Sequence, residues 1–394
     1  MTTLAIQTEN ELAELVRTRT QPMEIVGHGT KREYGRSAEM SDLLDMSAFS
    51  GIVEYDPGEL VITAKAATSL SEIEAAISEK RQRLGFDPAD WGPLFGAVEN
   101  AGTIAGALCA DTSGSARVRF GAARDHLLGY RAVNGFGEIY KAGGRVVKNV
   151  TGFDLPKLVC GAMGTLSALT EVTLRLVPMA PASVTIAIKG LSADEAFLQL
   201  RRIWSSPLEA TGLAYIPDGL STKFPELGAI GAGAAIIRIE GAPTPLKDKL
   251  VMLHALTGHS EAPPLDDGDA AFRKIGSGAP YADNDFDVWR IAIPPSQAAD
   301  VARSLAGTAW LADWAGGLFW IGISKTDETL AARLRQIAMR AKGHARLMRA
   351  SAETRAKIAV YRPEDLARAA LTRAVKAAFD PKGILNPGRM IEGV

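Results

Sequence analysis

The chain has 394 residues, of which 47% are hydrophobic, and its 44 Lys and Arg nearly balance its 45 Asp and Glu. This length exceeds that of a usual single domain, and the composition is that of an ordinary globular protein, which excludes disorder and fibrous repeats. The balanced charge gives no reason to expect nucleic acid as a partner. Residues 331–394 nevertheless hold 14 basic and 5 acidic side chains. We interpret this tail as a solvated helical surface, with a surface for an anion or an acidic partner as the alternative.

The two cysteines, Cys109 and Cys160, form no C-x-x-C pair. A disulfide framework, an iron–sulfur site and a zinc ribbon are therefore not expected. The N-terminus lacks the basic-then-apolar order of a signal peptide, and no apolar run reaches about 18 residues. We expect a cytoplasmic chain that does not cross a membrane.

The predicted elements of the first 180 residues alternate between helix and strand. Apolar residues at helical spacing predict a helix over 10–19. Thr68 or Ser69, with Glu72 placed as in a capping box, predicts the start of a helix over about 70–83. Strands are expected over 23–26, 51–55, 60–64 and 169–177.

Beyond a boundary near residue 180, the same order of elements occurs twice. A strand, a helix and a strand are predicted over 183–189, 194–204 and 210–216, and again over 287–293, 296–305 and 319–323. This weak β-α-β repeat predicts an antiparallel sheet backed by helices on one face. The segment 262–285 is rich in Pro, Asp and Gly and is predicted to be an exposed loop. A last helix is expected over 363–379.

Glycine is concentrated in one part of the chain. Residues 85–165 contain 15 of the 39 glycines. Helix and strand interiors disfavour glycine, so this density indicates tight turns or a backbone that comes very close to a ligand. We take this segment as the functional centre.

The compact signatures of common sites are absent from the sequence. It contains no G-x-G-x-x-G, no P-loop, no H-E-x-x-H and no G-x-S-x-G motif. The five histidines include no H-x-H pair, so we expect no metal site.

Three glycine-rich loops remain as candidates for chemistry. GHGTKREYG, over 27–35, follows a predicted strand, and its backbone N–H groups can form an anion-binding nest to which Lys31 or Arg32 adds charge. A simple surface turn explains that loop alone equally well. In the loop over 99–125, glycines allow backbone to lie against a phosphate or a ring, and Thr and Ser residues offer hydroxyls. The third stretch, over 143–174, contains VKNVTGFDLPKL.

In this order, the motifs G-x-G-T-K, G-T-I-x-G, S-G-x-x-R-x-x-x-G-x-x-R-D, V-K-N-V-T-G-x-D-L and G-x-x-G-T-L resemble the FAD-binding domain of the vanillyl-alcohol oxidase family. The tail FDPKGILNPGRM resembles that family's C-terminal signature. VKNVTGFDLPKL and the overall length most resemble the FAD-binding subunits of bacterial glycolate oxidases. Each motif is weak alone, but together they span nearly the whole chain.

The resemblance implies an α+β fold of the PCMH type. Its FAD-binding domain, over 1–180, would consist of two α+β subdomains. A smaller ferredoxin-like α+β cap would follow over 181–350. Residues 351–394 would form a helical segment that packs back on the FAD domain.

The resemblance also assigns the residues that bind FAD. The loop at the end of the first strand would hold the pyrophosphate, the second loop would approach the diphosphate, ribitol and flavin, and the tail would return to the flavin region. The implied residues are Gly27, His28, Gly29, Thr30, Lys31, Gly102, Thr103, Gly106, Ser113, Gly114, Gly121, Leu169 and Asn386. Relatives with a histidine-linked flavin carry G-G-H, whereas Gly29 takes that histidine's position here. We therefore expect non-covalent FAD.

The implied activity is that of an FAD-dependent oxidoreductase acting on CH–OH groups. As a subunit of a glycolate oxidase, the chain would work with a larger FAD-containing catalytic subunit and an iron–sulfur subunit, and such a complex would associate with the inner face of the membrane through the partners. Related hydroxy-acid dehydrogenases have a metal-binding H-x-H and a histidine base, and this chain has neither. Its catalytic residues are therefore left open. The alternatives are a self-sufficient dehydrogenase for another hydroxy acid or alcohol and a non-catalytic scaffold.

Overall fold

The structure is a computed structural model that describes residues 2–37, 40–145, 153–259, 262–283 and 286–394. Most of the V-K-N-V-T-G motif lies in 146–152, outside the described residues. The chain forms two compact units. No helix in the described ranges is both long enough and apolar enough to span a bilayer. Unit 1 consists of Met1–Thr112, Ala122–Met179 and Ala359–Val394, and unit 2 consists of Ser113–Gly121 and Ala180–Ile358.

Unit 1 begins with a small parallel sheet. Strands β1 (Thr2–Ala5) and β2 (Met23–Val26) both pair in parallel with β3 (Asp42–Asp45). Helix α1 (Glu9–Thr18) starts at Thr8, which forms a capping box with Glu11, and it buries Leu12 and Val16. The sequence did not predict β1 and β3, since four-residue strands carry little periodic signal.

A second, mostly antiparallel sheet makes up the rest of unit 1. Its strand order is β4-β5-β9-β7-β8, and β6 pairs with the end of β9. Apolar side chains of α2 and α3 pack on this sheet around Val172 and Leu174. Its strands are β4 (Ile52–Asp56), β5 (Val61–Lys65), β6 (Gln82–Leu84), β7 (Leu127–Asn134), β8 (Ile139–Gly143) and β9 (Ser167–Pro178), and its helices are α2 (Leu70–Ser78), α3 (Ile104–Ala110) and α5 (Leu155–Val159).

The helix predicted over 70–83 is shorter than expected. Ser69 caps α2 by accepting a hydrogen bond from the Glu72 N–H, but the helix ends at Ser78. The chain then turns through Arg81, whose φ is 54°, into β6. The expectation was wrong because Gln82 and Leu84 are buried where β6 pairs with β9, a long-range contact that overrides helix propensity.

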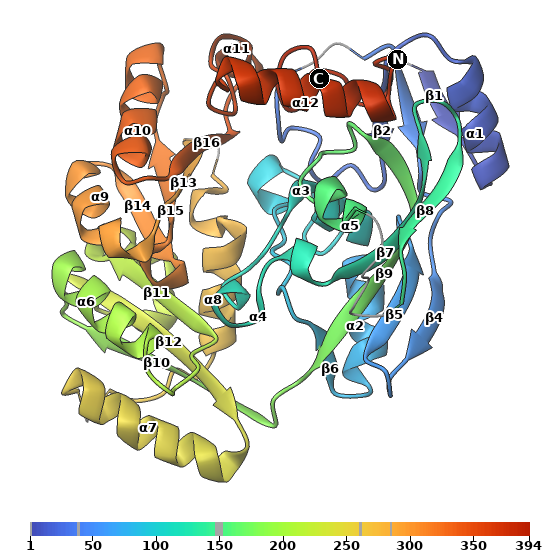
Figure 1. Cartoon of the computed structure of the whole chain (residues 1–394). Coiled ribbons are helices and arrows are strands. Elements are labelled where there is room, and N and C mark those ends of the chain that lie inside the picture. The colour runs from blue at the N-terminus through green and yellow to red at the C-terminus, as the bar shows by residue number, and fades with distance from the viewer. Residues whose placement is uncertain (1, 38–39, 146–152, 260–261, 284–285) are drawn as a thin grey trace. The chain divides into compact units, whose positions relative to one another are not determined.

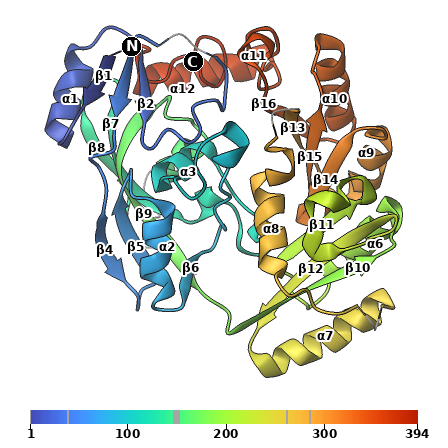
Figure 2. The ribbon, with the colours of Figure 1, turned by 180° about the vertical axis from the view of Figure 1, so that it is seen from behind.

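The C-terminal segment belongs to unit 1. Helix α12 (Leu366–Phe379) lies beside β2 and β8 in both ribbon views (Figures 1 and 2). Beyond it, the Met23 N–H donates to the Ile384 carbonyl, and Leu385 forms a parallel bridge with Met23. The tail therefore extends the small sheet at β2.

Unit 2 is built on a seven-stranded antiparallel sheet of order β10-β12-β11-β14-β15-β13-β16. Its first three strands and the next three have the same β-α-β-β order, and the two copies meet where Tyr215 pairs with Ala312. The strands are β10 (Ala182–Lys189), β11 (Gly212–Pro217), β12 (Gly233–Gly241), β13 (Asp287–Ala292), β14 (Ala309–Asp313), β15 (Leu318–Ile323) and β16 (His344–Arg349), and the helices are α4 (Arg117–Phe120), α6 (Ala193–Trp204), α7 (Pro243–Thr257), α9 (Ala298–Ser304), α10 (Glu328–Arg340) and α11 (Ala352–Lys357).

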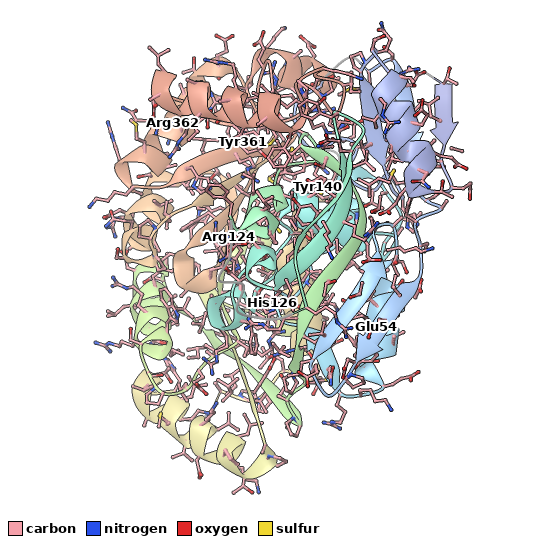
Figure 3. The ribbon with its side chains drawn as sticks, turned by 45° about the vertical axis from the view of Figure 1, so that its right-hand side comes forward. Glu54, Arg124, His126, Tyr140, Tyr361 and Arg362 are labelled. Carbon is pink, nitrogen blue, oxygen red and sulfur yellow. The ribbon has the colours of Figure 1, made fainter. Side chains whose placement is uncertain are left out.

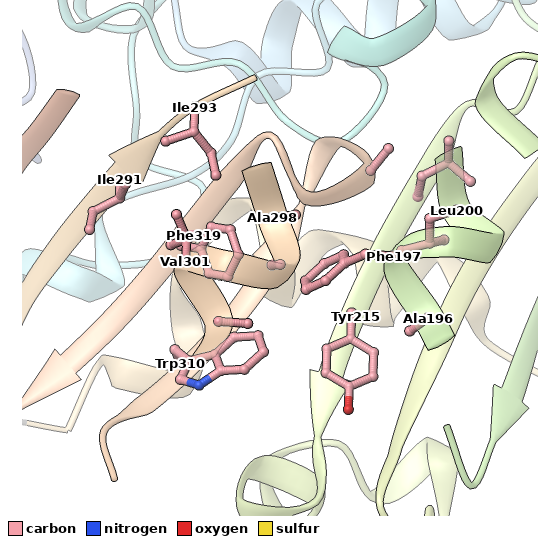
Figure 4. Close-up of a cluster of buried hydrophobic side chains, with 14 of the residues drawn as sticks. Ala196, Phe197, Leu200, Tyr215, Ile291, Ile293, Ala298, Val301, Trp310 and Phe319 are labelled. Atoms are coloured by element: carbon pink, nitrogen blue, oxygen red, sulfur yellow. The ribbon is translucent and has the colours of Figure 1, made fainter. Parts of the chain in front are cut away.

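The core of unit 2 lies between one face of this sheet and its helices. Phe197 of α6 contacts the rings of Tyr215, Trp310 and Phe319 (Figure 4). All four side chains are nearly inaccessible to solvent. The two sequence copies thus share a single core.

The predicted loop over 262–285 contains a helix, α8 (Gly268–Ser277), so that expectation was wrong. Asp267 caps the helix, and Phe272 and Ile275, spaced for one helical face, are buried. Phe272 packs against Gly212 and under the Arg238 guanidinium. Ile237 and Ile239, on either side of Arg238 in the sequence, point into the core, so Arg238 points to the opposite face of the sheet. Helix α8 therefore covers the other face of the sheet, and the helices are not confined to one face as expected.

Candidate functional site

A cavity opens in unit 1 where β2 ends. An adjoining cavity shares Gly27, Thr103 and Asn386 with it. These cavities bring together most of the residues that the sequence predicted. The first is lined by Gly27, His28, Gly29, Thr30, Lys31, Thr103, Gly106 and Asn386, and the second also by Leu169.

The two glycine-rich loops pack directly against each other beside the cavity. A Cβ atom at Gly27 would lie 3.1 Å from the Thr103 hydroxyl, so the backbones could not approach as closely with a larger residue. The His28 ring, which is exposed, lies with Nδ1 3.0 Å from the Ala101 carbonyl oxygen. Gly29 has a φ of 73°, which lets the loop turn at the mouth of the cavity.

Thr103 organises the second loop. Its hydroxyl accepts a hydrogen bond of 3.2 Å from the Gly106 N–H, and a Cβ at Gly106 would be 2.9 Å from the same oxygen. The Gly102 carbonyl accepts from the Leu70 N–H, which fixes the loop to α2. Gly106 and Thr103 line the cavity. Gly102 does not, although a Cβ atom there would lie 3.6 Å from Lys31 Nζ.

Lys31 supplies the positive charge at this point. Its ammonium donates to the Thr30 hydroxyl at 3.1 Å and lies 3.6 and 3.7 Å from where Cβ atoms of Gly102 and Gly106 would be. Desolvation lowers the pKa of Lys31 to about 8, against the opposing influence of Asp90 and Cys109. A desolvated ammonium beside glycine backbone is suited to bind an anion. The bound anion would favour the protonated, charged form of Lys31.

Asn386 ties the C-terminal tail to the cavity. Its side-chain oxygen accepts from the Ile25 N–H at 2.8 Å, and its amide donates to the Met163 carbonyl at 2.7 Å. With these bonds made, Asn386 is buried and holds three segments in place. Asn386 therefore positions the C-terminal tail beside the cavity, which is compatible with the predicted return of the tail to the flavin region.

Arg389 and Glu24 also line the cavity, and the sequence reasoning missed them. Arg389 donates to the Glu24 carboxylate at 3.0 Å and to the Lys31 carbonyl at 3.0 Å. Arg32 binds the same carboxylate. These ion pairs lower the pKa of Glu24, although its burial acts in the opposite direction and is the largest single influence. The one signal in the sequence that could have identified Arg389 is its place in the C-terminal motif FDPKGILNPGRM.

Three predicted residues, Ser113, Gly114 and Gly121, lie in unit 2 rather than unit 1. The Ser115 hydroxyl donates to the Asp313 carboxylate at 2.6 Å, and the Trp314 indole N–H donates to the Gly114 carbonyl at 3.1 Å. These bonds anchor the segment to the turn between β14 and β15. The flavin contacts of these three residues stay a prediction.

Unit 2 also contains a cluster of positive side chains, Arg117, Arg290, Arg346 and His344, which we call the cationic cluster. Arg290 and Arg346 are directly opposite each other on β13 and β16. Arg117 and Arg290 both lie over the Trp314 ring, 4.6 and 5.4 Å from its centre. No local pattern predicted this cluster, because its members are up to 229 positions apart.

Comparisons with known proteins agree with this geometry. Residues 3–143 match the FAD binding domain family, and residues 354–390 match the C-terminal domain of FAD linked oxidases. The chain is 30% identical to the glycolate oxidase subunit GlcE of Escherichia coli over 94% of this chain and 92% of that protein. It is 28% identical to the uncharacterized FAD-linked oxidoreductase Rv2280 of Mycobacterium tuberculosis, over 97% of this chain and 88% of that protein.

Solved structures share the fold. p-Cresol methylhydroxylase with substrate bound superposes with a TM-score of 0.71 at 14% identity, covering 99% of this chain and 88% of its own. Alkyldihydroxyacetonephosphate synthase gives a TM-score of 0.68 at 17% identity, covering 98% and 75%. The expected α+β fold of the PCMH type is confirmed. From its likeness to GlcE along almost the whole length, and from the two matching domains, the chain belongs to the family of FAD-linked oxidases, and its cofactor is FAD.

Proposed function

We propose that this chain is the FAD-binding subunit of a multi-subunit glycolate oxidase that converts glycolate to glyoxylate and passes electrons to an iron–sulfur partner. The single observation that carries the proposal is the likeness to GlcE over nearly the full length of both proteins. The glycine-lined cavity supports it, because Lys31 and the backbone of two loops converge there.

The residues around the cavity fit the chemistry of FAD. Backbone N–H groups of the loop over 27–31 and of the turn over 102–106, with the Lys31 ammonium, would hold the diphosphate. Leu169 and Ser167 line the adjoining cavity, which would receive another part of the cofactor. When bound, FAD accepts a hydride, and the protein's part is to bind and orient the cofactor and the substrate.

We propose that the flavin is held without a covalent bond. Burial raises the pKa of the Cys109 thiol to about 11, so the one cysteine that lines the cavity is a poor nucleophile. The His28 ring is engaged with the Ala101 carbonyl. Acid precipitation of the yellow protein should leave FAD in the supernatant, and a flavin that stays with the polypeptide would contradict this.

The partners that we propose are a larger FAD-containing subunit and an iron–sulfur subunit, in a cytoplasmic complex attached to the membrane through them. Helix α12 offers a surface for one of them. Leu366 and Leu371 are 89% and 65% exposed, and Arg368 and Arg373 flank them. A complementary surface would be apolar with acidic edges. Leu371→Asp with Arg373→Glu should abolish co-purification with co-expressed partners, while Lys80→Glu, an exposed change on the same unit, should not.

The activity is tested with the purified chain and with the co-expressed complex. The chain alone should show a flavin spectrum or regain one with added FAD, and a colourless protein that FAD cannot reconstitute would favour a scaffold. Glycolate added anaerobically should bleach the flavin in the complex. Full bleaching of the isolated chain would favour a self-sufficient dehydrogenase instead.

A pair of substitutions at Gly102 tests the cofactor site. Gly102→Asp places a carboxylate next to the Lys31 ammonium and should abolish FAD binding, because it neutralises the charge that the diphosphate needs. Gly102→Ala is the matched control and should retain FAD, since the nearest atoms would be at ordinary contact distances of 3.5 and 3.6 Å. Retained FAD in the Asp variant would contradict the assignment of this loop.

A further inference from the structure

The C-terminal tail of unit 1 packs against the loop that lines the cavity at the end of β2. The Arg36 N–H donates to the Arg389 carbonyl at 2.8 Å, and a Cβ atom at Gly35 would lie 2.8 Å from the same oxygen. A larger residue at position 35 would therefore push the tail away from the loop. The tail is also folded on itself, since the Gly388 N–H donates to the Val394 carbonyl at 2.6 Å and Val394 is buried.

Arg389 contacts this loop through its side chain as well. Its guanidinium donates to the Lys31 carbonyl at 3.0 Å and also to the Arg32 carbonyl. The Glu24 carboxylate accepts from the same guanidinium at 3.0 Å, which fixes its orientation. The Arg389 side chain is only 13% exposed. One buried guanidinium therefore holds two successive carbonyl oxygens of the loop.

The two carbonyls belong to residues that line the cavity, as does Arg389. A carbonyl oxygen carries a partial negative charge and would repel a diphosphate, whereas backbone N–H groups attract one. Bonding to a guanidinium offsets part of that negative charge and restrains the two peptide groups. The loop is thereby held in one conformation before the cofactor arrives, which reduces the entropy that binding must remove.

The C-terminal segment restrains a second part of the cavity wall at Met163. The Asn386 amide donates to the Met163 carbonyl at 2.7 Å, and Met163 lines both cavities. The Tyr361 hydroxyl, from the residues before α12 (Figure 3), donates to the Met163 sulfur at 3.7 Å. Met163 has a φ of 51°, a left-handed conformation that persists only where surrounding contacts impose it. The tail therefore fixes carbonyl groups on two segments beside the cavity.

We propose that Arg389 is a positioning residue for the cofactor, which holds the Lys31 and Arg32 carbonyls so that the loop presents its N–H groups and the Lys31 ammonium to the FAD diphosphate. FAD binding and the docking of residues 386–394 are then coupled, and each favours the other by the same factor. The inference rests on the proposed placement of the diphosphate against this loop, which Gly102→Asp tests by itself. It does not depend on which substrate the flavin oxidises.

The test measures FAD binding to the full chain by calorimetry, after the resident cofactor has been removed. Arg389→Met should weaken FAD binding by roughly 10- to 100-fold, because two carbonyl oxygens lose their cation and the loop gains freedom. Arg389→Lys keeps a positive charge without the planar fork and should give a smaller loss. The Lys variant also supplies the measurement if Arg389→Met fails to fold.

Lys382→Met is the matched control. Lys382 belongs to the same tail and also donates to backbone carbonyls, those of Val16 and Arg17 at the end of α1. Its loss should lower the free energy of unfolding but leave FAD affinity unchanged, since none of these three is among the described residues that line the cavity. Equal weakening of FAD binding in Lys382→Met and Arg389→Met would show that any loosening of the tail has this effect, and would overturn the proposal.

Two further readouts separate a positioning role from a merely structural one. Hydrogen exchange of the Arg36 amide, which donates to the Arg389 carbonyl, should slow when FAD binds to the natural protein and should respond much less in Arg389→Met. FAD binding should still weaken above pH 8 in Arg389→Met, because Lys31 remains as the titrating group, whereas Lys31→Met removes that dependence.

The proposal is overturned if Arg389→Met and Arg389→Lys both bind FAD like the natural protein, or if FAD leaves exchange of the Arg36 amide unchanged. Failure of the diphosphate placement is recognised separately, because Gly102→Asp would then retain FAD. If Gly102→Asp loses FAD while both Arg389 variants keep it, the assignment of the loop stands and only the positioning role of Arg389 fails.

Discussion

Two desolvated lysines of unit 1 differ in how their charge is compensated. Lys376 donates to the Asp380 carboxylate and to the carbonyls of Thr165 and Leu385. Lys31, among the described residues, donates only to the Thr30 hydroxyl and lines the cavity. Desolvation lowers the pKa of both, but only Lys376 has a carboxylate partner in direct contact. Lys376 is thus fully used in holding the tail, whereas Lys31 is available for a ligand.

Unit 2 repeats the contrast with arginines. Arg238 is buried, bonds Asp269 and Thr211 at 3.2 Å, lies 3.5 Å from Glu240 and stacks on Phe272. Arg290 instead lies over the Trp314 and Trp320 rings and is directly opposite Arg346 on the neighbouring strand. In unit 1, the lysine that contacts a carboxylate holds the tail, and the lysine that lacks such a contact lines the cavity.

Lys376→Met should have the largest effect on stability. It leaves the Asp380 carboxylate, which is fully buried, without its cation, and we expect the free energy of unfolding to fall by about 3–5 kcal/mol. Lys141→Met, at an exposed position on β8, is the control for chemical denaturation and should change little. If Lys376→Met loses little stability, the free-energy cost of desolvating the Lys376–Asp380 pair is about as large as the attraction between the two charges.

Arg238→Met and Arg303→Met should separate a buried arginine from an exposed one. Arg238→Met removes a buried cation that bonds Asp269 and lies 3.5 Å from the Glu240 carboxylate, and it should lower the free energy of unfolding by about 2–4 kcal/mol. Arg303→Met removes an exposed arginine that pairs with Asp194 and Asp300, so we expect little change in that free energy. Equal losses in thermal or denaturant unfolding would remove the distinction.

Lys31 should make FAD binding depend on pH. With the pKa near 8 in the empty protein, the diphosphate favours the protonated lysine, so binding takes up a proton above that pH. The dissociation constant should rise by up to about tenfold per pH unit above 8. Lys31→Met should bind FAD more weakly and without this dependence, and an unchanged pH profile in the variant would contradict it.

The same lysine predicts the pH dependence of folding without FAD. Its pKa is lower in the folded state than the ordinary value of 10.5, so the unfolded chain binds more protons between about pH 8 and 10.5. Its contribution to the free energy of unfolding therefore rises with pH across that window. Comparing the empty natural protein with Lys31→Met by denaturation at pH 7 and pH 10 checks this sign.

A small effect is also expected at Gly29. Its φ of 73° suits glycine, and Gly29→Ala should cost about 1–2 kcal/mol of stability through backbone strain alone. Gly102→Ala has no such strain and should be neutral or slightly stabilising. Equal unfolding midpoints for the two variants would show that the loop over 27–31 relaxes freely.

Much of the fold could be predicted because its signals are local. The capped helix α1, the strands β2, β5 and β9, and the first strand and helix of each copy in unit 2 follow from periodicity and caps. The errors arose where a distant partner decides. β6 interrupts a helical pattern because it pairs with β9, and α8 forms within a Pro- and Gly-rich segment because its apolar side packs on the sheet.

The sequence by itself determined the cofactor loops, since glycine and threonine at fixed spacing are needed wherever backbone must approach a diphosphate. It also determined the duplicated order of elements in unit 2. Only the tertiary structure decided which charges are neutralised. Asn386 and Arg389 reach β2 from the far end of the chain, and Arg290 and Arg346 become neighbours through the pairing of β13 with β16. Such contacts depend on register and burial, which no local pattern encodes.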